Sequence, residues 1–180
     1  MQKPEEYPDH CLLQSAAQGD KQSFGMLYER YLAEIYRYVF FKVGDQQTAE
    51  DITEETFIKT WESLSRIYQG DGKIDNFRAW LYRIAKNLVI DFYRKHQPES
   101  LIQPSESAKY KSIEETVIEQ EQSNRILRAL QKMKPDFQQI IILRLINDLS
   151  HKEIAAIIGL SEGHSRILLY RALKNLKEVL

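Results

Sequence analysis

A cluster of carboxylates stands out in the first half of the chain, at Glu50, Asp51, Glu54 and Glu55. Clustered carboxylates can bind Mg²⁺ or Ca²⁺, or they can exchange protons in acid–base catalysis. The glycine, asparagine and backbone carbonyls of a calcium loop do not accompany them, and no Glu-x-x-His pair is present. The pattern therefore favours a solvated acidic face, or a docking face for a basic protein partner.

A second stretch, residues 76–96, places cations and aromatic rings along one side of an expected helix. Its apolar residues recur at three- and four-residue steps, the spacing of one helix face. They are Phe77, Trp80, Leu81, Ile84, Ala85, Leu88, Val89 and Phe92. The other face carries Arg78, Tyr82, Arg83, Lys86, Asn87, Tyr93, Arg94 and Lys95. Cations bind phosphates and flat rings stack on unpaired bases, so this face suits a single strand of nucleic acid. A core-packing helix with a basic outer face is the alternative that this stretch leaves open.

The segment from Ser150 to Leu176 predicts a helix, a turn centred on Gly159 and a second helix, which is the helix-turn-helix pattern. Ser150 and Glu153 form a capping box at the start of the first helix. The last helix is expected to face inward at Leu169, Ala172, Leu173 and Leu176. Outward-facing residues that can meet phosphates and base edges are Arg166, Tyr170, Arg171 and Lys174. An ordinary helical hairpin with a basic outer face is the alternative.

Other chemistry finds little support in the sequence. Cys11 is the only cysteine, so no intrachain disulfide or thiolate cluster can form. The histidines are scattered and give no metal-ligand set or nucleophile–base pair. Gly70 and Gly72 lack the spacing of a phosphate loop. We therefore expect no enzyme site, no metal and no cofactor.

Charge is segregated along the chain although the net charge of its 180 residues is only −1. Residues 45–62 carry about −5 and residues 76–96 carry about +4. Adjacent segments of opposite sign indicate that each segment binds a different partner, or that the two segments bind each other. The N-terminus has no signal-peptide core, and the apolar runs are too short to span a bilayer, so we expect a cytoplasmic protein without membrane insertion.

The fold is predicted to be all-α, because no stretch alternates apolar and polar residues for long enough to form a strand. After a loose tail over residues 1–8, a four-helix domain is expected over residues 9–96, with helices at 9–17, 21–43, 46–67 and 76–96. Residues 97–112 are rich in proline and serine and are predicted to form a linker. A second helical domain follows over 113–180, with helices at 113–133, 136–146, 151–158 and 162–179. Ile58 and Ile126 are expected on the inward faces of their helices.

Taken together, these segments resemble one protein family. AEDITEETFIKTW (49–61), NFRAWLYRIAKNLVIDFYR (76–94), a linker and the helix-turn-helix are similar, in that order, to the extracytoplasmic-function (ECF) sigma factors of bacterial RNA polymerase. The earlier QGDKQSFGMLYERY (18–31) also matches the opening of the family. The resemblance covers roughly residues 12–96 and 113–178.

The resemblance implies a role for each charged surface. Core polymerase, through its β′ clamp, would bind Glu50, Asp51, Glu54 and Glu55. The loop 68–76 and the helix after it would open the −10 element and hold a flipped base, through Asn76, Arg78, Tyr82, Arg83, Lys86 and Asn87. The second domain would meet the β flap and read the −35 element through Ser161, His164, Arg166, Tyr170, Arg171 and Lys174. The linker would thread toward the polymerase active centre, and an anti-sigma protein would hold the factor inactive.

Three positions depart from the family pattern. Glu54 replaces a common Gln, and a carboxylate accepts hydrogen bonds but cannot donate them. Leu168 replaces a common Arg in the recognition helix, while Arg166 keeps a cation there. Met133 replaces a common Leu, an apolar exchange that a core tolerates. The base contacts of the recognition helix therefore do not carry over from the resemblance.

Two other functions are compatible with parts of the sequence. A helix-turn-helix regulator would bind duplex DNA alone and use the first bundle for dimerisation or sensing. A metal-dependent hydrolase would use the carboxylates of residues 50–55. Association with core polymerase distinguishes the sigma factor from the regulator, and divalent-ion binding would identify the hydrolase.

Overall fold

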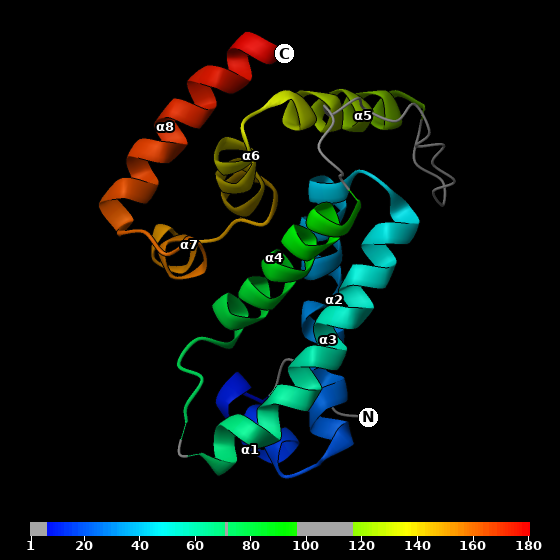
Figure 1. The fold of residues 1–180 in the computed structure, drawn as a ribbon, viewed down its shortest axis with the longest axis vertical. Coiled ribbons are helices and arrows are strands. Elements are labelled where there is room, and N and C mark those ends of the chain that lie inside the picture. The colour runs from blue at the N-terminus through cyan, green and yellow to red at the C-terminus, as the bar shows by residue number, and fades with distance from the viewer. Residues whose placement is uncertain (1–6, 71, 97–116) are drawn as a thin grey trace.

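The computed structural model describes residues 7–70, 72–96 and 117–180, with side chains from residue 125 onward in the last range. Within these residues every regular element is helical (Figure 1), which confirms the all-α prediction. The elements are α1 (Asp9–Ala17), α2 (Lys21–Val43), α3 (Gln46–Gln69), α4 (Phe77–His96), α5 (Val117–Lys132), α6 (Pro135–Ile141), the π-helical turn η2 (Ile142–Ile146), α7 (His151–Ile158) and α8 (Glu162–Val179). The predicted linker, residues 97–112, and most of the predicted tail lie outside the described residues.

Side-chain caps and a glycine set the boundaries of the first long helices. The Asp20 carboxylate accepts the backbone N–H groups of Gln22 and Ser23 at the start of α2. Gly44 ends α2 with φ of 76°, a left-handed conformation that costs glycine little. Asp45 then accepts the Thr48 N–H at 2.8 Å and starts α3. These short connections place α2 and α3 side by side.

The connection between α3 and α4 is fixed at both ends. A Cβ atom at Gly72 would lie 2.8 Å from the Ile67 carbonyl oxygen, so this close approach needs glycine. At the other end, the Asn76 side-chain oxygen accepts the Ala79 N–H at 2.9 Å. Asn76 therefore caps α4 and satisfies one of the amides that a helix start leaves unpaired.

Helices α1–α4 form an N-terminal bundle around a core of large apolar side chains. The fully buried ones include Leu13, Leu27, Ile35, Leu64 and Leu81. Three buried threonines of α3 donate their hydroxyls to carbonyls four residues earlier, at 2.6–2.7 Å, and so need no partner from another helix. These are Thr53, Thr56 and Thr60.

Helices α5–α8 form a C-terminal bundle that contains the helix-turn-helix. Before α7, the turn η2 widens the helix: Asn147 N–H donates to the Ile142 carbonyl five residues back at 3.0 Å. The predicted capping box is confirmed, because Ser150 and Glu153 bond each other's backbone N–H groups. Gly159 ends α7 with φ of 76°, as the turn prediction required.

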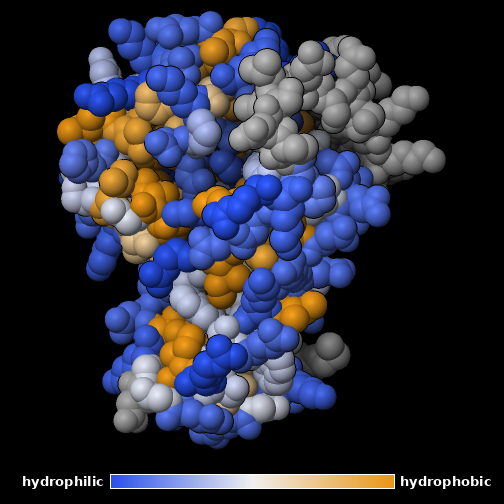
Figure 2. All heavy atoms as spheres, in the orientation of Figure 1, coloured by the Kyte–Doolittle hydropathy of each residue, from blue (hydrophilic) through white to orange (hydrophobic). Residues whose placement is uncertain are grey.

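The two bundles pack against each other. Helix α7 lies against α4, and η2 lies against α2 (Figure 1), so buried side chains of both bundles join one apolar cluster. Figure 2 shows hydrophilic side chains over most of the displayed face, with small separate apolar patches. Among the described helices, none is long and apolar enough to cross a membrane.

Several predictions of detail need correction. Ile58 and Ile126, expected to face inward, are 56% and 45% exposed. Tyr82, expected on the outer face of its helix, is fully buried, because the C-terminal bundle covers a second side of α4. The predicted helix over 136–146 is α6 followed by the π turn, and α3 runs two residues past its predicted end at residue 67.

Candidate functional site

The acidic face of α3 is open to solvent. Its four carboxylates are all exposed: Glu50, Asp51, Glu54 and Glu55. Glu55 pairs with Lys59 one turn later at 3.2 Å, and Glu50 accepts a hydrogen bond from Gln46 at 2.8 Å. These contacts lie within α3, so the carboxylates keep free lone pairs for a partner.

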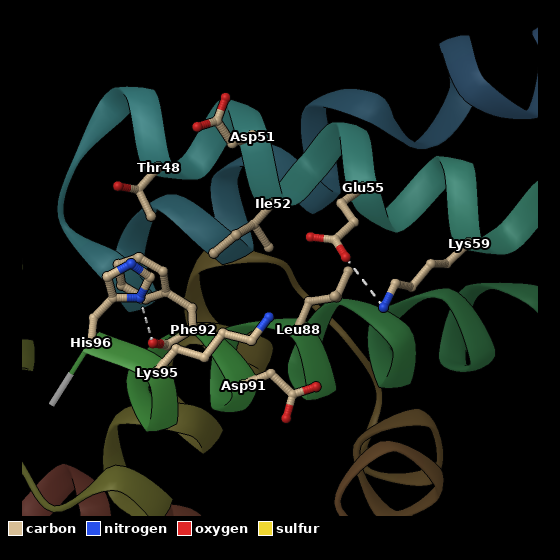
Figure 3. Close-up of a pocket in the computed structure, with 10 residues that line it drawn as sticks. All are labelled: Thr48, Asp51, Ile52, Glu55, Lys59, Leu88, Asp91, Phe92, Lys95 and His96. Carbon is tan, nitrogen blue, oxygen red and sulfur yellow. Dashed lines mark hydrogen bonds and ion pairs between the residues drawn. The ribbon is translucent and has the colours of Figure 1, made fainter. Parts of the chain in front are cut away.

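A groove of about 370 Å³ runs between α3 and α4 beside this face (Figure 3). Asp51 and Glu55 line it from α3, and Ile52, Leu88 and Phe92 supply apolar surface. The remaining lining residues are Thr48, Lys59, Asp91, Lys95 and His96. A groove lined by charged, polar and apolar side chains is suited to a protein helix that carries basic residues.

Sequence reasoning missed the contribution of α4 to this groove. Asp91, Lys95 and His96 line it, although the helix periodicity predicted only a core face and a nucleic-acid face for α4. The His96 ring stacks on Phe92 with ring centroids 4.5 Å apart, and its Nδ1 lies 2.9 Å from the Phe92 carbonyl oxygen. The spacing of Leu88, Phe92 and His96 at every fourth residue was the available signal. In the part of the chain that is described, no group of three His, Cys, Asp or Glu side chains could hold a metal ion.

The basic face of α4 divides into two parts. Arg83 and Asn87 are exposed, and Asn76 is exposed at the helix start, where it serves as the cap. Arg78, Tyr82 and Lys86 instead lie against the C-terminal bundle. The structure therefore places five of the six residues predicted for the −10 element on α4 and the sixth, Asn76, at its cap, and leaves three of the six facing solvent.

Arg78 is the centre of a polar network between the bundles. Its Nε donates to Glu34 at 2.8 Å, Nη1 to Glu153 at 3.2 Å and Nη2 to the Asn147 carbonyl at 3.0 Å. Burial acts to lower the pKa of Arg78, but the hydrogen bond and charge of Glu34 outweigh it and hold that pKa above its ordinary value. The guanidinium therefore stays charged, and its carboxylate partners compensate for its partial burial.

Tyr82 belongs to the same polar network as Arg78, since both contact Glu34 and Asn147. Its hydroxyl accepts a hydrogen bond from the Asn147 side-chain amide at 2.7 Å and donates to Glu34 at 3.3 Å. Burial, and then the charge of Glu34, raise the pKa of Tyr82 far above its ordinary value. Tyr82 is therefore a neutral core residue in this arrangement, with no face free for stacking on a base.

The outer face of α8 carries the residues predicted for the −35 element. Ser161 accepts the His164 N–H at 3.2 Å and caps the helix, and Arg166 pairs with Glu162 at 3.6 Å. The other exposed members are His164, Tyr170, Arg171 and Lys174. Buried Ser165 contacts His151 Nδ1 at 2.9 Å, which fixes α8 against α7. Ile167, not predicted, is 51% exposed on this helix and can contact a thymine methyl group.

Both bundles match families of known proteins. Residues 27–99 match Sigma-70 region 2, and residues 123–176 match Sigma-70 region 4. The chain is 33% identical over 174 residues to the ECF RNA polymerase sigma factor BldN of Streptomyces coelicolor, covering 94% of this chain and 64% of BldN. It is 31% identical over 166 residues to the RNA polymerase sigma factor YlaC of Bacillus subtilis, covering 88% of this chain and 92% of YlaC. The chain belongs to the ECF sigma factors. As a member of this family it serves promoter-specific transcription initiation.

Solved structures agree with this ECF sigma factor in fold. CnrH, solved in complex with the cytosolic domain of CnrY, is 25% identical, with a TM-score of 0.74 over 95% of this chain and 96% of CnrH. RpoE of Bartonella quintana, solved with the anti-sigma factor NepR, shares the fold at 24% identity and a TM-score of 0.65 over 88% of this chain and 96% of RpoE. A helix-turn-helix alone occurs in many classes of DNA-binding protein and does not distinguish a sigma factor from a regulator. The match to region 2 does distinguish them, and it decides for the sigma factor.

Proposed function

We propose that this sigma factor binds core RNA polymerase through the acidic face of α3 and the groove beside it. The observation that carries the proposal is the exposure of four clustered carboxylates, two of which, Asp51 and Glu55, line a groove with charged and apolar walls. Basic groups on the β′ clamp would pair with the carboxylates, and an apolar side chain of the clamp would enter the groove. The protein acts as a non-catalytic subunit in the cytoplasm, where it confers promoter specificity on the polymerase.

Charge reversal tests this docking surface. Asp51→Lys and Glu55→Lys should each weaken binding to core polymerase about tenfold, since each replaces a favourable charge contact by a repulsive one. Fluorescence titration of labelled sigma factor with core enzyme measures the affinity, and circular dichroism verifies the helical content.

Glu62→Lys is the matched control, because Glu62 is also exposed on α3 but does not line the groove. It makes the same change of charge and should leave the affinity for core polymerase within about twofold of wild type. Equal effects of Glu62→Lys and Glu55→Lys would mean that only net charge matters, and would contradict the assigned surface.

We propose further that the promoter is read at two places. The segment at residues 68–76, which includes the end of α3, and helix α4 contact the opened −10 strand, with Arg83 and Asn87 already exposed for it. Helix α8 enters the major groove of the −35 element, and the C-terminal bundle meets the β flap. Mapping the 5′ ends of transcripts after controlled overexpression would supply both elements as sequences shared upstream of the start sites.

Arg171→Ala should lower transcription from such a promoter about fivefold at moderate salt, because a phosphate contact is lost. It should also make transcription less sensitive to added salt. Lys177→Ala is the control, since Lys177 is an exposed cation in the last turn of α8, remote from the helix start that enters the groove. Transcription by reconstituted holoenzyme is the measurement, and equal losses in both variants would count against groove insertion by α8.

We also propose that an inhibitory protein controls this sigma factor. CnrH, with the same fold over nearly its full length, was solved in complex with the cytosolic domain of CnrY. An anti-sigma protein bound to this fold, as NepR is bound to RpoE of Bartonella quintana, would hold the factor away from core polymerase. Co-purification from the native host tests the idea, and recovery of the factor with core enzyme alone would refute it.

A further inference from the structure

One flank of α4 is covered by the helix-turn-helix of the same chain. Arg78 bonds Glu153 at the start of α7 and the Asn147 carbonyl just before it. Lys86, two turns further along α4, approaches the Ile157 carbonyl near the end of α7 at 3.5 Å. The cations of this flank are thus bound by acceptors of the C-terminal bundle.

A second contact between the bundles lies at α2. Buried Lys42 donates to the Gln138 side chain at 2.8 Å, and Gln139 donates to the Tyr38 hydroxyl at 3.0 Å. Both glutamines belong to α6, so α2 and α4 together bind α6, η2 and α7. The bundles therefore meet in a specific, hydrogen-bonded arrangement rather than in an apolar contact alone.

This closed arrangement is too compact for a promoter. The −10 and −35 elements lie 25 base pairs apart by their names, which is roughly 85 Å of duplex. Helix α4 contacts α7 and α7 contacts α8, and packed helix axes lie about 8–10 Å apart, so α4 and α8 are separated by roughly 20 Å. One promoter cannot reach both surfaces until the bundles separate.

The contacts of Arg78 divide into a fixed one and exchangeable ones. Glu34 belongs to α2 of the same bundle and can hold the guanidinium in either arrangement. Glu153 and the Asn147 carbonyl belong to the C-terminal bundle and are lost on separation. After separation, Glu34 would still orient the guanidinium through Nε, and the N–H groups of Nη1 and Nη2 would be available to bind a phosphate.

We infer that Arg78 is the latch of a closed state and that domain closure competes with strand binding. Arg78 exchanges Glu153 and the Asn147 carbonyl for a phosphate of the opened −10 strand, and Lys86 exchanges the Ile157 carbonyl in the same way. The inference rests on the proposed role of α4 in strand binding. Closure and binding exclude each other, so the affinity for the strand is reduced by the fraction of molecules that are closed.

Glu153→Gln tests the ion pair between Arg78 and Glu153 without disturbing the start of α7. Glutamine also serves at this position of a capping box, so α7 keeps its start, while the charge that faces Arg78 is removed. Spin labels at Cys11, which is exposed, and at a cysteine introduced by Lys177→Cys report the distance between the bundles. A labelled pool of random single-stranded DNA, about 12 nucleotides long, reports strand binding by fluorescence anisotropy.

We expect the wild type to give one short distance, and Glu153→Gln to add a population at longer distance and to bind the strand pool about fivefold more tightly. Asp148→Asn is the matched control. It removes one charge from the same turn, where Asp148 pairs with Arg144 at 3.3 Å outside the interface, and asparagine tolerates its φ of 48°. It should change neither measurement.

The outcomes separate the two hypotheses. Unchanged distances and binding in Glu153→Gln would overturn the latch while leaving strand binding by α4 intact. A short distance that persists in the strand-bound wild type would overturn the competition. If the distance lengthens but neither protein binds the strand, the proposed role of α4 in strand binding fails and the competition fails with it, while closure by Arg78 stands.

Discussion

Replacing Tyr82 by alanine should lower the free energy of unfolding by about 3–5 kcal/mol, the range for removing a large buried aromatic side chain. Tyr82 has 0% exposure, and its ring meets the Tyr38 ring edge-on at 5.2 Å between centroids. The cavity would open where α4, α2 and the C-terminal bundle meet, and few side chains there can move to fill it. Chemical denaturation followed by circular dichroism measures the loss.

Tyr82→Phe separates packing from hydrogen bonding. It keeps the ring but removes the acceptor of the Asn147 amide, so one buried N–H loses its partner at a cost of about 1–3 kcal/mol. We expect the phenylalanine variant to fall between wild type and Tyr82→Ala. A loss below about 1 kcal/mol for Tyr82→Ala would mean that this side chain is not part of the core.

The second large effect concerns Lys42 and pH. Burial lowers the pKa of Lys42 from 10.5 to about 8; the charge of Asp136 opposes this shift and that of Lys86 adds to it. Between about pH 8 and 10.5 the unfolded chain still binds a proton that the folded chain has released. The free energy of unfolding should therefore rise with pH across this window, by up to about 3 kcal/mol from this group.

Lys42→Met should abolish that rise and stabilise the protein below about pH 8, where the wild type buries a charged ammonium. Denaturation at about pH 7.5 and pH 9 tests the difference, since tyrosines of the unfolded chain, with a pKa of about 10, are still largely protonated at pH 9. Lys59→Met, at an exposed position of α3, should retain the wild-type pH dependence. The same slope in the Lys42 variant would contradict the assignment.

Several helix boundaries could be predicted because local chemistry determines them. Helices α2 and α3 begin at the predicted residues 21 and 46, where Asp20 and Asp45 cap them, and Gly44 and Gly159 follow the predicted ends of α2 and α7. The capping box at Ser150 was predictable for the same reason. The three charged surfaces followed from spacing on single helices, although which groups contact polymerase or DNA stays a prediction.

Contacts between distant segments could not be predicted from spacing. Periodicity assigns one buried face to a helix, but α4 is covered on two sides, so Tyr82 was placed in solvent. Ile58 is exposed for the opposite reason: an apolar residue at helical spacing is buried only where another element covers it, and none of the described elements covers α3 at Ile58. The groove between α3 and α4 likewise depends on how two separate helices align.

The π turn η2 has a consequence for the lengths of related chains. A π turn holds one residue more than the α-helical turn it replaces. Deleting a single residue within Ile142–Ile146 would convert it to an α-turn, rotating everything that follows by about 100° and shifting it by about 1.5 Å. The helix-turn-helix would survive intact, but the Asn147 carbonyl and Glu153 would no longer point at Arg78. A one-residue gap in an alignment at this turn would therefore mark relatives that keep the helix-turn-helix without the closed packing.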